Sequence, residues 1–364
     1  MVEKERLLKT LIDLIKIDSP SGEEDAIDAE LSSRLGALGC QVQHDSYNNL
    51  IAKLPGEGEP VLLSSHMDTV DPGRGINPML EDDTLRSDGS TILGGDCKAG
   101  LTIVLEALAC IQESGQDSRV PHRPVEVVFT RHEEGGLVGV HHLDFSLVTA
   151  KMGVVFDGEG PVNRVTVAAP SQNVVTANIK GRAAHAGVEP EKGISAILIA
   201  AEILNKLPLG RIDQETTANI GRMDAGLKRN IIPESAFLDG EIRSRDNAKL
   251  DDVSNEFRRI FDQMAAQHPE ARISLDIQNA YQAYQVDDRH PAVAMISRAL
   301  RSLGEDVELK ASGGGSDSNV LFEHGIVALP VGIGVQSFHT TWEKAKISEV
   351  LRGAEFCQAL IAGV

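Results

Sequence analysis

The amino-acid sequence predicts an α/β protein with a mostly parallel sheet and flanking helices, interrupted by a ferredoxin-like α+β domain. Over roughly the first 160 residues, short aliphatic segments alternate with helix-like segments, and this alternation returns near the C-terminus. Between these parts, from about residue 167, the order becomes strand, helix, strand, strand, helix, strand, which is the ferredoxin-like order. Short buried strands separated by helices are typical of a parallel sheet with helices on both faces.

The first elements are predicted from periodicity and from residues that begin or end helices. Leucine and isoleucine side chains fall on one face of a helix over about 3–17. In the next helix Ser21 can cap the N-terminus, with Glu24 three residues later, and Gly39 can end it. AGLTIVLEALACIQESG predicts a buried helix. The aliphatic segments predict strands at 50–54, 61–65, 125–130 and 152–156.

The inserted module is predicted over residues 167–281. Its segments are VVTANIKG, ISAILIAAEILNKL, TTANIG, SAFLDGEIRSR, NAKLDDVSNEFRRIFDQMAAQ and RISLDIQNA. HPAVAMISRALRSLG then predicts a helix and IVALPVGIG a strand of the first domain. We therefore expect residues 1–166 and 282–364 to form one domain and residues 167–281 a second.

Composition excludes several classes of partner. The formal net charge of −19 disfavours nucleic acid and anionic membranes. No segment is long and apolar enough to span a membrane, and the charged N-terminal stretch lacks the apolar core of a signal peptide. The four cysteines show no C-x-x-C spacing, which favours reduced thiols. These features predict a cytoplasmic protein.

Imidazole and carboxylate side chains follow the predicted strands. Ligands of doubly wound sheets bind at the carboxyl ends of the strands. Taken one at a time, these residues also suit helix caps, turns or a solvated acidic pair. Together they indicate one shared site, because independent surface residues have no reason to fall at successive strand ends. The residues are His66, Asp68, Asp96, Glu133, Glu134, Asp157 and His339.

Histidine nitrogens and carboxylate oxygens without a thiolate favour Zn²⁺, with Co²⁺ or Mn²⁺ as substitutes. His66 and Asp68 are two residues apart, so on a strand they share a face, and Asp68 can orient the second ring nitrogen of His66. Two neighbouring cations need a shared carboxylate, and Asp96 is our choice for it.

The order SSHMDTV, GGDCKAG, EEGG, VVFDG and SFHT resembles the dinuclear zinc exopeptidase family, which includes peptidase T, aminoacylases, glutamate carboxypeptidases, acetylornithine deacetylase and succinyl-diaminopimelate desuccinylase. The resemblance spans nearly the whole chain, and its S-H-M-D-T-V and G-G-D-x-K-A-G forms are most similar to peptidase T and tripeptidase-like proteins. The family's insert serves as a lid and dimerisation domain. A sibling family of metallo-aminopeptidases has similar ligands without a lid, and the long interval between Asp157 and His339 favours the lidded family.

The resemblance implies a role for each of these residues. It implies that His66 and Asp157 bind one Zn²⁺, that Glu134 and His339 bind the other, and that Asp96 bridges them.

It further implies that Asp68 supports His66 and that Glu133 is the general base. Peptidase T usually has a second aspartate where this chain has Cys97, which leaves the ligand set intact. The peptide bond after the bridging aspartate is commonly cis in these relatives, so we expect a cis bond between Asp96 and Cys97.

The function implied is a metal-dependent exopeptidase that removes the N-terminal residue from short peptides, as peptidase T does with tripeptides. A dizinc-activated water would attack the peptide bond with Glu133 as general base. An N-acyl-amino-acid deacylase, or a carboxypeptidase or dipeptidase, is the alternative within the same chemistry. A catalytically silent metal- or peptide-binding protein is the alternative from another class, but no ligand or base is missing.

Substrate residues are expected in the insert and in one glycine-rich loop. His185 in GRAAHAG matches a family histidine that contacts the reacting carbonyl, often of the partner subunit of a homodimer, although it also suits a polar loop. Arg243 suits a substrate carboxylate, the alternatives being a structural ion pair for Arg243 or the same role for Arg245. Asn230 is expected to reach the site, and Gly314 in SGGGSDSN to let the backbone approach a ligand.

Overall fold

The structure, a computed structural model, describes residues 2–117 and 121–363. The chain divides into two compact units. The first unit consists of Met1–Val167, Val286–Ala311 and Ser316–Val364, and the second of Ala168–Gln285 and Ser312–Gly315. The second unit thus ends at Gln285 rather than residue 281 and also includes a short piece of the glycine-rich loop.

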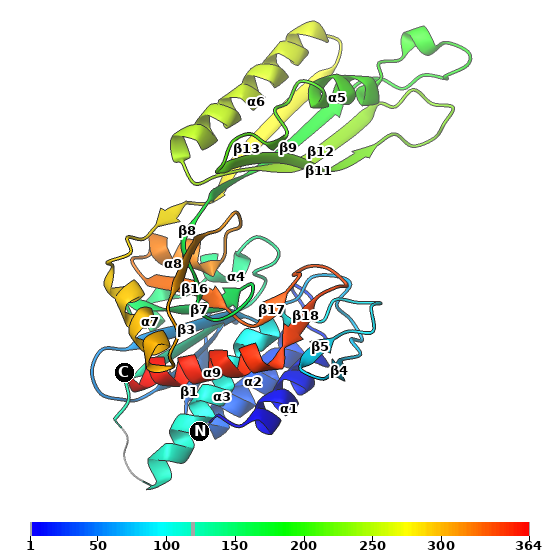
Figure 1. Cartoon of the computed structure of the whole chain (residues 1–364). Coiled ribbons are helices and arrows are strands. Elements are labelled where there is room, and N and C mark those ends of the chain that lie inside the picture. Colours follow the sequence, from blue (N-terminus) through cyan, green and yellow to red (C-terminus); the bar gives the residue numbers. More distant parts are fainter. Residues whose placement is uncertain (1, 118–120, 364) are drawn as a thin grey trace. The chain divides into compact units, whose positions relative to one another are not determined.

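The main sheet has a parallel centre and antiparallel edges (Figure 1). Its order is β1-β2-β6-β3-β7-β16-β8-β14, with β15 paired to β8. The neighbours β6, β3, β7 and β16 run parallel, whereas the pairs β1–β2, β2–β6, β16–β8 and β8–β14 are antiparallel. The strands are β1 (Gln41–His44), β2 (Leu50–Leu54), β3 (Val61–His66), β6 (Val125–Thr130), β7 (Met152–Gly158), β8 (Arg164–Ala169), β14 (Tyr284–Gln285), β15 (Glu308–Ala311) and β16 (Val327–Gly332).

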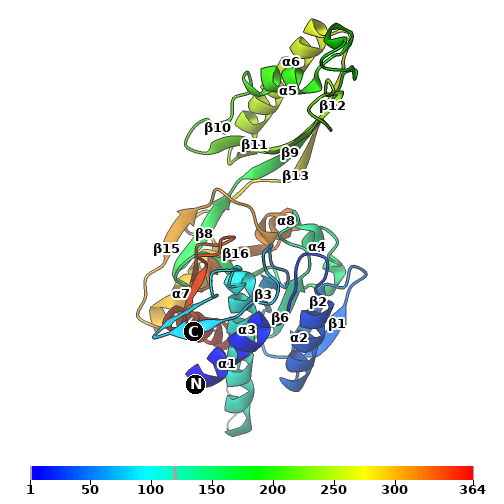
Figure 2. The same ribbon diagram turned by 90° about the vertical axis from the view of Figure 1, so that its right-hand side faces the viewer.

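Every residue of β3 and of β6 is buried, as expected for a sheet with helices on both faces. Helix α3 packs on β3 and β7, with α1 and α9 beside it. Helix α2 packs on β1 and β2 (Figure 2). The helices of the first unit are α1 (Lys4–Ile15), α2 (Asp25–Ala37), α3 (Gly95–Asp117), α4 (Val138–His141), α7 (Pro291–Ser302), α8 (Asp317–Glu323) and α9 (Ile347–Ala362). The predicted fold class and the four predicted strands are confirmed.

The first unit also contains a second, small sheet. Its order is β17-β18-β5-β4, and the pairs are antiparallel. Its strands are β4 (Met79–Glu81), β5 (Thr84–Arg86), β17 (Val335–Gln336) and β18 (Lys344–Lys346). The sequence pattern did not reveal this sheet, because strands of two or three residues carry no period.

The start of α2 differs from the expectation. The helix begins at Asp25 after Glu24, and no side chain caps it. The Ser21 hydroxyl, which we expected to be the cap, donates a hydrogen bond to Asp68 instead. The predicted end is correct in position, since Gly39 follows the helix with φ +84°, a left-handed conformation that favours glycine.

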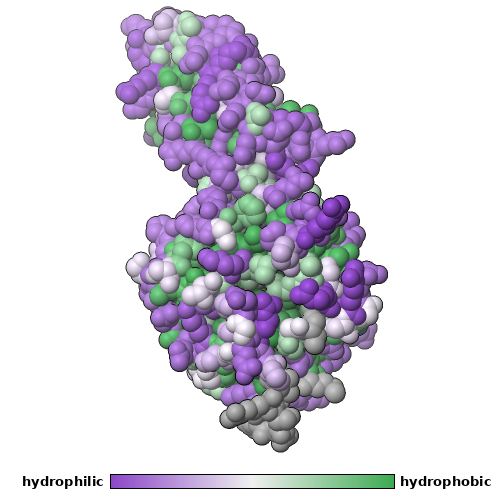
Figure 3. Space-filling model, turned by 90° about the vertical axis from the view of Figure 1, so that its left-hand side faces the viewer, coloured by the Kyte–Doolittle hydropathy of each residue, from purple (hydrophilic) through white to green (hydrophobic). Residues whose placement is uncertain are grey.

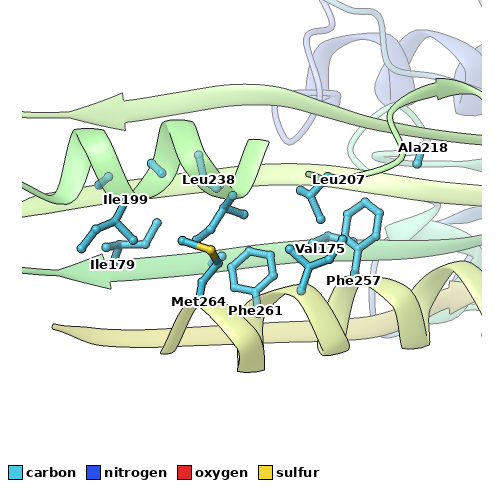
Figure 4. Packing of buried hydrophobic residues seen from close by; sticks show 14 of the residues in the cluster. Val175, Ile179, Ile199, Leu207, Ala218, Leu238, Phe257, Phe261 and Met264 are labelled. Atoms are coloured by element: carbon cyan, nitrogen blue, oxygen red, sulfur yellow. The ribbon is translucent and has the colours of Figure 1, made fainter. Parts of the chain in front are cut away.

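The second unit has the predicted ferredoxin-like topology. Its antiparallel sheet has the order β10-β11-β12-β9-β13. One face packs against α5 and α6, and the buried side chains include Val175, Ile199, Leu238, Phe257 and Phe261 (Figure 4). The elements are β9 (Ser171–Lys180), α5 (Ala196–Leu204), β10 (Gly210–Arg211), β11 (Thr216–Ala225), β12 (Ser235–Ser244), α6 (Asn247–Gln267) and β13 (Arg272–Tyr281).

The face of the molecule shown in Figure 3 is mostly hydrophilic, with groups of hydrophobic residues between the hydrophilic ones. Among the described residues, we find no helix with the length and apolar character needed to span a membrane.

Gly100 of α3 sets how closely this helix approaches the sheet. A Cβ atom at this position would lie 2.3 Å from the carbonyl oxygen of Phe156 and 2.6 Å from Oγ of Ser65. We predict that Gly100→Ala lowers the free energy of unfolding by about 1–3 kcal/mol, because the helix must move away from β3 and β7. Chemical denaturation followed by circular dichroism measures this change.

Gly36→Ala is the matched control, because Gly36 also lies in a helix but a Cβ atom there would meet nothing within 4 Å. It should leave stability unchanged or raise it by up to about 1 kcal/mol. Equal stability of the two variants would contradict the close packing of α3.

Candidate metal centre

The carboxyl ends of the four parallel strands bring the predicted ligands together. His66 is the last residue of β3, and Asp157 lies at the end of β7. Glu134 follows β6, and His339 lies in the loop after β17. Asp96 lies at the start of α3. Ligands that are far apart in the sequence thus meet at one edge of the sheet.

The Asp96 carboxylate stands between two histidines. Its Oδ1 atom is 3.2 Å from Nε2 of His66, and its Oδ2 atom is 3.2 Å from Nε2 of His339. Asp157 lies on the His66 side, with Oδ1 3.6 Å from Nε2. Glu134 lies on the His339 side, with Oε1 3.0 Å from Nε2. One carboxylate therefore belongs to two clusters, as a bridging ligand must.

These donors fit two divalent cations. In each cluster the candidate ligand atoms lie within 4.8 Å of one another. Within residues 2–117 and 121–363, the only basic side chains paired with Asp96, Asp157 and Glu134 are the two histidines. Buried carboxylates need compensating charge, and metal ions would supply it.

The electrostatics of the site follow from burial. Burial raises the pKa of Asp157 to about 7, although His66 opposes this effect. Burial acts in the same direction on Asp96, but hydrogen bonds from His339 and His66 outweigh it and lower the pKa of Asp96 to about 2. Of the two clusters, the one around His66 is the more enclosed, since the His66 side chain is 2% exposed and that of His339 is 53% exposed.

Asp68 connects the His66 cluster to the segment that follows β6. Its Oδ1 accepts the N–H of Glu133 at 2.9 Å, and its Oδ2 accepts the N–H of Glu134 at 3.1 Å. Oδ2 also accepts the Ser21 hydroxyl at 2.6 Å. Nδ1 of His66 is 3.0 Å from the main-chain oxygen of Asp68 and 3.4 Å from its carboxylate. Asp68 therefore orients the backbone of two acidic residues as well as the imidazole.

Glu133 extends its carboxylate into the same space. A ligand atom of Glu133 lies within 4.8 Å of ligand atoms of both His66 and Glu134. Burial raises the pKa of Glu133 well above its ordinary value, and the charges of neighbouring acidic residues raise this pKa further. His66 partly offsets the increase in pKa. The carboxylate is thus next to the ligands, where it can act on a molecule bound between them.

Cys97 lies next to the His66 cluster, and its sulfur is within 4.8 Å of candidate ligand atoms of His66, Asp96 and Asp157. Its thiol donates to the carbonyl oxygen of Phe156 at 2.6 Å, and burial raises its pKa to about 12. The expected cis peptide bond between Asp96 and Cys97 is confirmed.

The remaining predicted residues belong to the second unit, where they form two pairs. His185 and Asn230 lie side by side, since the N–H of Ala186 donates to the carbonyl oxygen of Asn230 at 3.0 Å. Arg243 makes a two-bond ion pair with Glu241, at 2.9 and 2.8 Å. Gly314 is its neighbour, because a Cβ atom there would lie 3.8 Å from the Arg243 guanidinium.

Arg245, the alternative to Arg243 as a carboxylate-binding residue, donates hydrogen bonds from its guanidinium to backbone carbonyl groups. It donates to the oxygen of Ser312 at 3.3 Å and to that of Gln214 at 3.5 Å.

Three polar residues around the site were not identified from the sequence. Ser21 bonds to Asp68, and Glu343 accepts two backbone N–H groups of the Asp96 loop. Asp317 accepts the hydroxyl of Thr130, and among the described residues its buried Oδ1 has no hydrogen-bond partner. Asp317 lies in SGGGSDSN, for which the sequence predicts only a glycine-rich loop. The contacts of these three residues join segments that are distant in the sequence, and no sequence pattern indicates such contacts.

Two family models match parts of the chain. The peptidase dimerisation domain matches residues 173–269, and peptidase family M28 matches residues 49–189. The first match lies within the second unit, and the second covers most of the ligand-bearing strands.

Similar proteins cover the whole chain. An aminopeptidase PepT from Bacillus cereus has a solved structure with a TM-score of 0.86 and 38% identity, over 100% of this chain and 99% of that one. A tripeptidase from Staphylococcus aureus has a TM-score of 0.90 and 33% identity, over 100% and 98%. The Bacillus subtilis protein YqjE, described as uncharacterized, is 39% identical over 99% of both chains.

Proposed function

Because this chain belongs to the peptidase T family of dinuclear metallopeptidases, we propose that it is a zinc-dependent aminopeptidase that removes the N-terminal residue from tripeptides. The observation that carries the proposal is the Asp96 carboxylate, whose two oxygens each lie 3.2 Å from a different histidine. Such an arrangement suits two cations that share one carboxylate, and two-metal sites of this kind are used in aminopeptidases.

The proposed ligands of one ion are His66 and Asp157, those of the other are Glu134 and His339, and Asp96 serves both. Nitrogen and carboxylate donors favour Zn²⁺, with Co²⁺ and Mn²⁺ as substitutes. When bound, the two ions would polarise the scissile carbonyl and make a water molecule acidic enough to act as nucleophile at neutral pH.

In this proposal Glu133 moves the protons. Its carboxylate takes one from the attacking water and passes it to the nitrogen of the leaving amine, first as a general base and then as a general acid. Asp68 supports this step by holding the N–H groups of Glu133 and Glu134, so that both carboxylates keep their direction.

We assign the substrate contacts to residues of the second unit as part of the same proposal. The imidazole of His185 can donate to the carbonyl oxygen under attack, and the side chain of Asn230 can bond to the peptide backbone. The Arg243 guanidinium can bind the substrate carboxylate when it releases its hydrogen bond to Glu241. Gly314 has no side chain, so it leaves space beside this guanidinium. The match to a peptidase dimerisation domain supports a homodimer formed through this unit.

A hydrolysis screen tests the function. The zinc-loaded protein should release the N-terminal residue from tripeptides with a free amino group and should act slowly on their N-acetylated forms. Preferred cleavage of acylated amino acids would indicate a deacylase, and release of the C-terminal residue a carboxypeptidase. No hydrolysis of any of these compounds by protein that binds two zinc ions would overturn the enzymatic proposal.

Glu133 and Glu134 should respond differently to the same substitution. We predict that Glu133→Gln lowers kcat by at least about 10²-fold with unchanged zinc content, because this residue acts on water. Glu134→Gln should instead lower the affinity for one of two zinc equivalents, because it removes a ligand charge. Zinc analysis after dialysis, combined with assays at saturating peptide, separates the two effects. Exchanged phenotypes would reverse the assignment.

His185→Ala should keep both zinc equivalents and lower kcat by roughly 10²-fold, because a donor to the developing oxyanion is lost. His268→Ala is the control in the same unit, since His268 pairs with Glu202 on the surface. If His185 serves the partner subunit, mixing inactive Glu133→Gln protein with His185→Ala protein restores activity after subunit exchange. Wild-type turnover by His185→Ala would remove this histidine from the mechanism.

A further inference from the structure

The buried carboxylate of Glu343 contacts the backbone of residues 94–96, the turn at the start of α3. The residue is 1% exposed. Its Oε2 accepts the N–H of Gly94 at 2.8 Å, and its Oε1 accepts the N–H of Asp96 at 2.8 Å. Both oxygens of one side chain therefore hold the turn from which the shared carboxylate extends.

The same short hairpin also carries His339. Strands β17 and β18 pair with each other, and the loop between them begins after Gln336 and ends before Lys344. Within this loop the N–H of Glu343 donates to the carbonyl oxygen of Thr340 at 3.1 Å. His339 reaches Oδ2 of Asp96, while Glu343 holds the N–H of Asp96. One hairpin thus contacts the aspartate at its backbone and at its carboxylate.

The contact between hairpin and turn is tight. A Cβ atom at Gly95 would lie 3.0 Å from Val335 and 3.2 Å from Oε1 of Glu343. Gly95 therefore packs closely against the hairpin, and the two hydrogen bonds hold the turn to it.

A cap for the first N–H groups of α3 is the simpler explanation of Glu343. A carboxylate is a costly choice for that purpose, because it is buried beside the like charge of Asp96. The cost is offset if cations lie nearby and if the direction of Asp96 matters for holding them.

We propose that Glu343 is a positioning residue that fixes the direction of the Asp96 carboxylate, so that each of its oxygens serves a different metal subsite. This inference rests on the proposed dinuclear function, and it assigns to Glu343 no contact with metal or substrate. Without Glu343 the carboxylate can rotate towards one subsite, and the site should then hold one ion well and the second poorly.

Glu343→Gln tests the proposal, because its amide NH₂ would face one of the two backbone donors. Calorimetric titration of the metal-free protein with Zn²⁺ should show one equivalent at nearly wild-type affinity and a second weakened by about 10–100-fold. The melting temperature of the metal-free variant should stay close to that of the metal-free wild type, whereas its rise on zinc loading should be smaller. Glu81→Gln, an exposed position of the same small sheet, should behave as wild type.

Two wild-type equivalents in folded Glu343→Gln protein would overturn the proposal. Equal weakening of both equivalents with a lower melting temperature of the metal-free protein would also overturn it, in favour of a purely structural cap. If the glutamine variant does not fold, Glu343→Asp keeps the charge with a shorter reach and should show the same selective loss. A folded Glu343→Asp protein that binds both Zn²⁺ equivalents with wild-type affinity would also contradict the proposal.

The outcomes also separate this inference from the proposed function. Wild-type protein that binds two zinc ions but hydrolyses no peptide would end the enzymatic proposal and leave the positioning role standing. Wild-type protein that binds a single equivalent would overturn both.

Discussion

One carboxylate between two imidazoles is the contact on which the site depends. Asp96 faces His66 with one oxygen and His339 with the other. This requires that β3, the start of α3 and the hairpin β17–β18 keep fixed positions relative to one another. Close packing of α3 on β3 and β7, through Gly100, sets one side of this arrangement. The small sheet β17-β18-β5-β4 sets the other. Three parts of the first unit thus converge on a single side chain.

Strand geometry accounts for part of the predicted site, whereas the roles of Asp96 and His339, which lie outside the parallel strands, were predicted from the resemblance. His66, Glu134 and Asp157 lie at ends of parallel strands, and such ends meet at one edge whatever lies between them in the chain. Their chemical types then indicate a cation. The same reasoning extends to the ferredoxin-like unit, where elements of nine or more residues have a clear period.

Contacts between loops were not predictable in this way. Ser21 has the residue type and spacing of a helix cap, and only the folded chain brings its hydroxyl to Asp68. Glu343 lies in an irregular loop, and its partners Gly94 and Asp96 are more than two hundred residues away. Loops have no periodicity from which a register can be inferred, so polar residues that act through the backbone of a distant loop leave no sequence pattern.

The path of the chain into and out of the second unit has an evolutionary consequence. Ala168 and Ala169 of β8 pair with Gln285 and Tyr284 of β14, so the chain leaves and returns through two strands bonded to each other. A segment with adjacent ends can be acquired or deleted in one genetic event without changing the order of the remaining strands. A catalytic sheet of this kind can therefore exist with or without the extra unit during descent.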